Sequence, residues 1–123
     1  MTMPPSHRSP SPDVAALRVA TEGVVTQLIS QTRGQARLIR SGAAGELTEA
    51  DVERIAAGIA AAARARLEAS VPDWQSPSAD PELHTTRREA AQMMASAARE
   101  VDAQLRNAWR TRQEKAGGRW WRR

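Results

Sequence analysis

The chain has 123 residues, a formal net charge of +4 and no cysteine. This length supports one hydrophobic core and one domain, and the lack of thiols excludes disulfides, cysteine nucleophiles and cysteine-ligated zinc. Leu, Ile and Val together contribute only 18 residues, Phe and Tyr contribute none, and Ala contributes 24. Because alanine is the strongest helix former, this composition predicts an all-α protein with a thin core.

A core built largely from alanine stabilises a monomer weakly. Apolar burial contributes about 25 cal/mol per Å², whereas ordering the backbone costs about 1 to 2 kcal/mol per residue. Small side chains therefore leave little net stability. Alanine faces also let two helices approach closely, so we expect a homo-oligomer or a chain that becomes more stable on a partner.

The N-terminal segment is predicted to be a disordered arm over residues 1–12. It contains Pro4, Pro5, Pro10 and Pro12 and little apolar mass, a composition that forms neither helices nor a core. The segment lacks the apolar stretch of a signal peptide, and no run in the sequence approaches the ~20 apolar residues of a membrane span. A cytoplasmic location is the default expectation.

A first helix is predicted over residues 13–40, where apolar and small polar residues recur every three or four positions. Its predicted inner face consists of Val14, Leu17, Thr21, Val24, Leu28, Gln31, Gln35 and Leu38. Gly23 and Gly34 each cost about 1 kcal/mol relative to alanine. With the β-branched residues 24–26 between them, they leave a strand as a minority alternative. Residues 41–45 contain two glycines and predict a loop.

A second helix is predicted over residues 48–70, because Thr48 is a good N-cap and acidic residues follow it in the first turn. Its predicted inner face consists of Val52, Ile55, Ile59, Ala62 or Ala63, and Leu67. The same segment is compatible with a helix-turn-helix whose turn lies near Gly58. No N-cap residue follows that glycine, so one continuous helix is favoured.

Residues 71–80 contain Pro72 and Pro77 and are predicted to separate two helices. Trp74, in the middle of this linker, is expected to pack back onto the core. Asp80 as N-cap, followed by Pro81 at the first helical position, predicts the start of the third helix.

The third helix is predicted over residues 80–116, ending at a C-cap formed by Gly117 and Gly118. Its predicted inner face follows a seven-residue rhythm through Leu83, Arg87, Ala90, Met94, Ala97, Val101, Leu105 with Gln104, and Ala108. At 1.5 Å per residue this helix is about 54 Å long. We therefore expect its C-terminal turns to project beyond its shorter neighbours.

Together these elements predict a three-helix antiparallel bundle, or an elongated helical protein, with a helical domain over residues 13–116. The disordered arm precedes it, and a short basic tail of residues 117–123 follows.

The sequence offers little for catalysis or metal binding. His7 and His84 are the only histidines and are not spaced to share a metal. Carboxylate pairs such as Glu49 and Glu53 lie near Arg54 and indicate solvated ion pairs. We therefore expect no enzyme activity, no cofactor, no metal and no small-molecule substrate.

The basic charge is concentrated at the C-terminus. Residues 1–105 contain 11 basic and 13 acidic residues, whereas residues 106–123 contain seven basic residues and one acidic residue. Trp109, Trp120 and Trp121 lie among them. The predicted binding residues are Arg106, Arg110, Arg112, Lys115, Arg119, Trp120, Trp121, Arg122 and Arg123.

Three partners fit a surface of guanidinium and indole groups. Nucleic acid is favoured, because arginine binds phosphates and tryptophan stacks on unpaired bases; binding would be largely independent of base sequence and suit an accessory or architectural role. Alternatively, Trp120 and Trp121 anchor the tail in a larger protein assembly, or the tail contacts an anionic membrane surface. In a fourth interpretation, Trp109 belongs to the core and the end is a solubilising tail.

Overall fold

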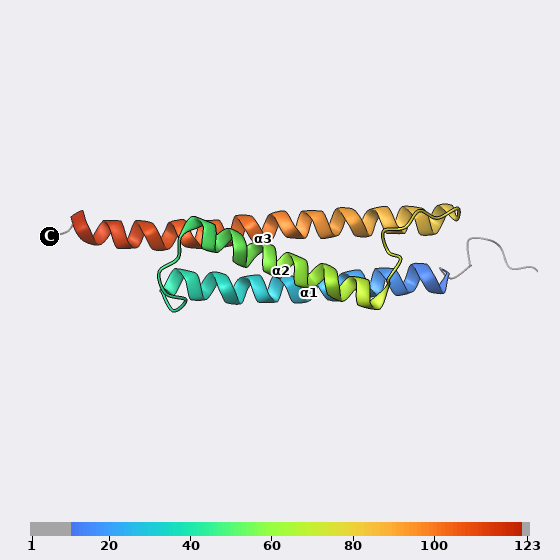
Figure 1. Cartoon of the computed structure of the whole chain (residues 1–123), viewed down its shortest axis with the longest axis horizontal. Helices are drawn as coiled ribbons and strands as arrows, with labels where there is room; N and C mark the ends of the chain where they lie inside the picture. The colour runs from blue at the N-terminus through green and yellow to red at the C-terminus, as the bar shows by residue number, and fades with distance from the viewer. Residues whose placement is uncertain (1–10, 122–123) are drawn as a thin grey trace, which may run out of the picture.

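A computed structural model describes the backbone of residues 11–121 and the side chains of residues 11–117. It contains three helices, α1 (Pro12–Ser41), α2 (Glu49–Ser70) and α3 (Pro81–Trp121). α1 and α3 run in the same direction, and α2 crosses them in the opposite direction (Figure 1). The predicted all-α three-helix bundle is confirmed, and the molecule is elongated.

α1 begins one residue earlier than predicted. The Ser11 side chain is the N-cap and accepts a hydrogen bond from the Val14 N–H at 3.3 Å, and Pro12 occupies the first turn. Proline suits this position because the first N–H groups of a helix have no intrahelical acceptor. The helix is continuous through both internal glycines, which rules out the strand alternative. Residues 1–10 of the predicted arm lie outside the described residues.

The buried face of α1 agrees with the predicted one only in its first half. Val14, Leu17, Thr21, Val24 and Leu28 are buried, followed by Thr32, Ala36 and Ile39. The predicted Gln31, Gln35 and Leu38 are wrong by one residue each. After Leu28 the buried positions advance by four, four and three residues, so the face drifts around the helix. This drift keeps Gln31 and Gln35 out of the fully buried core and brings the small Ala36 against the neighbouring helices.

Within the described part of the chain, three polar residues are buried in the core: Thr21, Thr32 and Thr86. Each hydroxyl donates to the backbone carbonyl four residues earlier, at 2.7, 2.8 and 2.9 Å respectively. Because a buried hydroxyl is costly only when it lacks a hydrogen bond, these residues are tolerated inside the bundle.

α2 starts at a complete capping box, as its sequence predicted. The Asp51 N–H donates to the Thr48 side chain at 3.1 Å, and the Asp51 carboxylate accepts from the Thr48 N–H at 2.9 Å. The Thr48 N–H lowers the pKa of Asp51 below its ordinary value. This contribution to stability is present at neutral pH and is lost as the pH falls through that lowered pKa.

Thr48→Ala removes one acceptor from the capping box and is expected to lower the free energy of unfolding by about 1 kcal/mol. Urea denaturation followed by circular dichroism at neutral pH measures the change. Thr26→Ala makes the same chemical change at an exposed position inside α1 and should not destabilise the protein, since alanine is the better helix former. Equal losses in both variants would contradict the role of the cap.

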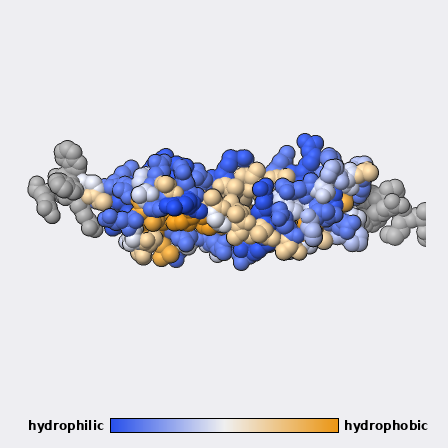
Figure 2. All heavy atoms as spheres, viewed as in Figure 1, coloured by the Kyte–Doolittle hydropathy of each residue, from blue (hydrophilic) through white to orange (hydrophobic). Residues whose placement is uncertain are grey.

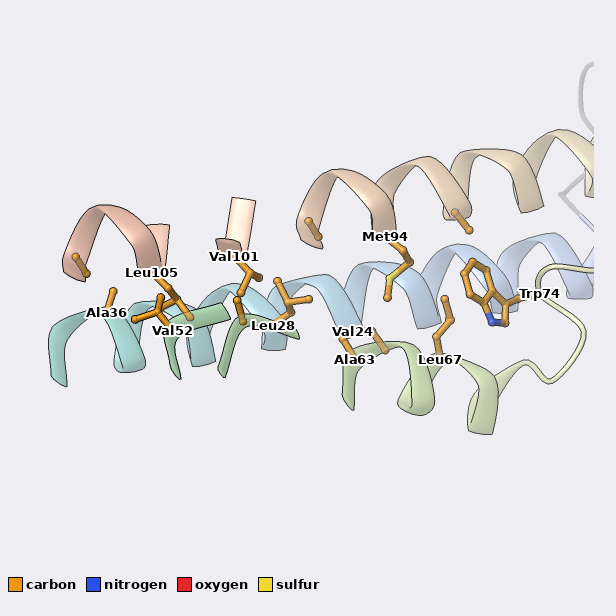
Figure 3. Close-up of a cluster of buried hydrophobic side chains, with 14 of the residues drawn as sticks. Val24, Leu28, Ala36, Val52, Ala63, Leu67, Trp74, Met94, Val101 and Leu105 are labelled. Carbon is orange, nitrogen blue, oxygen red and sulfur yellow. The ribbon is translucent and has the colours of Figure 1, made fainter. Parts of the chain in front are cut away.

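α2 is one unbroken helix, so the helix-turn-helix alternative is wrong. The linker after it returns Trp74 to the core, as predicted: only 1% of its surface is exposed, and its ring lies at the end of the row of core side chains, next to Leu67 (Figure 3). The Arg87 guanidinium donates to the Ser76 carbonyl and to the Asp73 carboxylate, both at 2.8 Å. Arg87 therefore fixes the linker to α3.

The inner face of α3 matches the prediction from Ala90 onward, whereas near the start of the helix Thr86 is buried and the predicted Leu83 and Arg87 are half-buried. Its buried residues include Ala90, Met94, Ala97, Val101, Leu105 and Ala108. The predicted end of the helix is wrong, because α3 continues through Gly117 and Gly118 to Trp121. In the described backbone only Gly42 and Gly45 adopt a positive φ. Glycine permits the left-handed conformation of a C-cap but does not impose it.

Candidate functional site

α1 and α3 end at the same end of the molecule, and α3 projects beyond α1 (Figure 1). α3 has 41 residues and α1 has 30, a difference of 11 residues, or roughly 17 Å. Both helix dipoles therefore direct their negative ends toward this end of the molecule, where cations are favourable. We call the exposed or half-buried cations of this region the basic end: Arg33, Arg37 and Arg40 on α1, and Arg110, Arg112 and Lys115 on α3.

Arg106, the first residue of the predicted binding set, is held by three carboxylates. Its guanidinium donates to Glu49 at 2.7 Å, to Glu53 at 2.6 Å and to Asp102 at 2.9 Å. The hydrogen bonds to Glu53 and Asp102 raise the pKa of Arg106. Since its charge is already balanced, Arg106 joins α3 to the first turns of α2 and is not part of the basic end.

Trp109 is also engaged with the bundle. Its indole N–H donates to the Leu47 carbonyl at 2.7 Å, and its half-buried ring packs against the core. Trp109 therefore anchors the loop between α1 and α2 onto α3. It is the one tail-region tryptophan whose side chain the structure describes.

Arg112 faces the end of α1. A Cβ atom added to Gly42, the left-handed C-cap of α1, would lie 2.8 Å from the Arg112 guanidinium carbon. The guanidinium therefore lies against the helix terminus, where carbonyl groups lack intrahelical donors. Arg110 is exposed, and Lys115 is exposed on the projecting part of α3. These two cations are freer to contact a partner than Arg112.

α1 also contributes cations to the basic end, which were not among the predicted binding residues. Arg33, Arg37 and Arg40 follow one another by four and three residues, so they lie on one exposed side of the last turns of α1. Among the described residues, none of the three forms an ion pair. Their spacing was the available signal, but only the parallel arrangement of α1 and α3 places this row at the same end as the C-terminal charges.

A hollow of about 360 Å³ lies between the α1–α2 loop and α3. Ile39 and Leu47 contribute apolar surface, Trp109 contributes an indole, and Arg112 contributes a guanidinium. An indole beside a guanidinium suits a planar, negatively charged group such as a nucleotide.

The remaining predicted residues are only partly described. The backbone of Arg119, Trp120 and Trp121 belongs to the last turn of α3, and their side chains, like Arg122 and Arg123, lie outside the described residues. Within the described part of the chain, no three acidic or histidine side chains gather as metal ligands. No helix there is long and apolar enough to cross a bilayer.

Neither a family model, nor a curated protein, nor a solved structure matches this chain. Its function must therefore be inferred from its own residues.

Proposed function

We propose that this protein binds nucleic acid through the basic end, largely independently of base sequence. The observation that carries the proposal is a helix that leaves the bundle and continues into a strongly basic segment. Residues 106–123 contain seven cations and one carboxylate. Arg106 is ion-paired, so this segment has six other cations that could contact phosphates.

The arginine row of α1 supports the same proposal from a second element. Because α1 ends at the point from which α3 projects, Arg33, Arg37 and Arg40 add cations to this region. Phosphate contacts dominate the affinity of non-specific nucleic-acid binders, and arginine pairs well with phosphate. A helical rod with basic side chains on it needs no base-specific contact to bind.

The salt dependence of binding tests this proposal. We expect the full chain to bind labelled single- and double-stranded oligonucleotides at about 50 mM salt and to lose affinity steeply by about 200 mM. If these six cations and the three arginines of α1 each displace one counterion, the slope of log Kobs against log salt for double-stranded DNA has a magnitude of about 8. Fluorescence anisotropy over a salt series gives this slope. No binding at low salt would refute the proposal.

Replacing individual cations of the basic end by glutamine identifies the residues that contact nucleic acid. Arg110→Gln with Lys115→Gln should reduce the slope by about two, and the triple variant of Arg33, Arg37 and Arg40 to Gln by about three. Arg99→Gln is the matched control, because Arg99 is exposed on the body of α3. A control slope that falls as much as that of the variants would place the contact elsewhere.

Trp120→Ala with Trp121→Ala distinguishes stacking from charge alone. If the indoles stack on unpaired bases, single-stranded binding weakens by about tenfold or more, and double-stranded binding changes less.

Two further measurements distinguish the alternative partners, a protein assembly and an anionic membrane surface. Recovery of one specific protein that depends on the two tryptophans, without oligonucleotide binding, would indicate docking to a protein assembly. Co-sedimentation with anionic but not neutral vesicles would indicate a membrane surface.

A further inference from the structure

The outward face of α2 and the groove beside it form an unpartnered apolar surface. Ala57, Ala61 and Ala65 lie along the middle of this face, and all three are exposed; we call them the alanine face. Between α2 and α3 runs an open groove of about 440 Å³ with Leu28 and Met94 among its lining residues. Figure 2 shows apolar residues gathered across the middle of the molecule, where α2 crosses in Figure 1.

Two opposite charges flank the alanine face. Arg54 lies seven residues before Ala61, and Glu68 lies seven residues after it. At about 100° per residue, positions separated by 14 residues fall within about 40° of each other around the helix. Both side chains are exposed. Arg54 pairs with Asp51, and Glu68 has no ion pair among the described residues.

This pattern is self-complementary about Ala61. If a second copy of α2 lies antiparallel to the first with a two-fold axis at Ala61, Ala57 lies opposite the partner's Ala65. The same operation places Arg54 opposite the partner's Glu68, and it does so twice, because a two-fold interface repeats every contact. Gly58 then faces the partner's Arg64, and a glycine leaves room for that long side chain.

The shallowness of the alanine face also favours a second copy of α2 as the partner helix. Methyl groups make the alanine face shallow, so a partner helix with small residues can approach closely and bury backbone as well as side chains. A partner with large side chains would be held away. The thin core of this protein makes such additional burial valuable to its stability.

We propose that two copies of this chain associate through α2, antiparallel about Ala61, with the Arg54–Glu68 pairs closing both ends of the contact. In such a dimer the basic ends point in opposite directions. Ala61 lies twelve residues from Glu49 at the start of α2, Glu49 contacts Arg106 of α3, and Lys115 lies nine residues beyond Arg106. These 21 residues span about 32 Å along the axis, so the two basic ends of the dimer lie roughly 60 Å apart. If the proposed function also holds, one dimer can therefore bridge two nucleic-acid segments.

Charge reversal tests the dimer without nucleic acid. Sedimentation of the full chain at up to about 100 µM should show a monomer–dimer equilibrium. Arg54→Glu alone and Glu68→Arg alone each place like charges opposite one another, and each should raise the dissociation constant about tenfold or more. An equimolar mixture of the two variants restores both attractive pairs and should form heterodimers. Arg99→Glu, the same charge change on the exposed side of α3, should leave the dimer unchanged.

A single introduced thiol tests the axis. The chain has no cysteine, so Ala61→Cys places one thiol next to its own copy in the dimer. Mild oxidation should yield a covalent dimer, whereas Ala16→Cys, exposed on α1, should yield little. Disulfides require Cα atoms within about 7 Å.

The proposal is overturned if the parent chain is monomeric throughout. It is equally overturned if the two charge variants fail to associate on mixing while circular dichroism shows both to be folded, or if Ala16→Cys cross-links as readily as Ala61→Cys. None of these outcomes bears on the salt-dependent binding of oligonucleotides, so the two proposals fail separately.

Discussion

Replacing Trp74 by alanine is expected to lower the free energy of unfolding by about 3 to 5 kcal/mol. Trp74 is the largest buried side chain among residues 11–117, and it closes one end of the core from the linker between α2 and α3. Small domains have about 5 to 15 kcal/mol of stability in total, and a core rich in alanine has few large residues to compensate. The variant should be partly unfolded at room temperature. Urea denaturation and near-ultraviolet circular dichroism measure this loss.

Trp74→Phe is the matched control. The indole N–H of Trp74 is buried and has no acceptor among the described residues, and an unsatisfied buried donor costs about 1 to 3 kcal/mol. Phenylalanine retains most of the ring and removes that donor. We therefore expect Trp74→Phe to retain most of the stability of the parent. A loss as large as that of the alanine variant would mean that the indole nitrogen is hydrogen-bonded in solution.

Ala63→Leu is expected to destabilise the protein by about 1 to 3 kcal/mol. Ala63 is completely buried in α2, and the close approach of α2 to the other helices depends on its small side chain. Three additional carbon atoms at this position require the helices to separate or the leucine to adopt a strained rotamer. Thermal unfolding, together with the sharpness of the transition, detects both effects.

Ala62→Leu makes the same change one residue earlier, at an exposed position beside the groove between α1 and α2. A leucine there would extend into an open groove with a volume of about 590 Å³, so the substitution should be neutral or slightly stabilising. If both leucine variants were equally stable, the core around Ala63 would be loosely packed.

Local signals in the sequence were sufficient to predict most of the helix boundaries. The capping box of Thr48 and Asp51 and the prolines of the linker act over one or two turns, so they can be read without the fold. The inner face of α3 was also predictable from Ala90 onward, since a seven-residue rhythm specifies one side of a helix.

The helix end at Gly117 was not predictable in the same way. Two adjacent glycines are a common C-cap signal, but α3 passes through them, because their effect is only a preference of about 1 kcal/mol each. The prediction for the second half of the buried face of α1 was wrong for a related reason. Alternative faces one residue apart are nearly equivalent in the pattern, and packing against the neighbouring helices selected Thr32, Ala36 and Ile39.

The sequence by itself determined three helices, their approximate lengths and the concentration of charge after residue 105, because composition, periodicity and caps are local properties. The tertiary structure alone decided which charges are free. It placed Glu49 and Glu53 of α2 on Arg106 and left the arginine row of α1 unpaired within the described residues. Ion pairing depends on distances between residues more than 50 positions apart, and only the packing of the helices sets those distances.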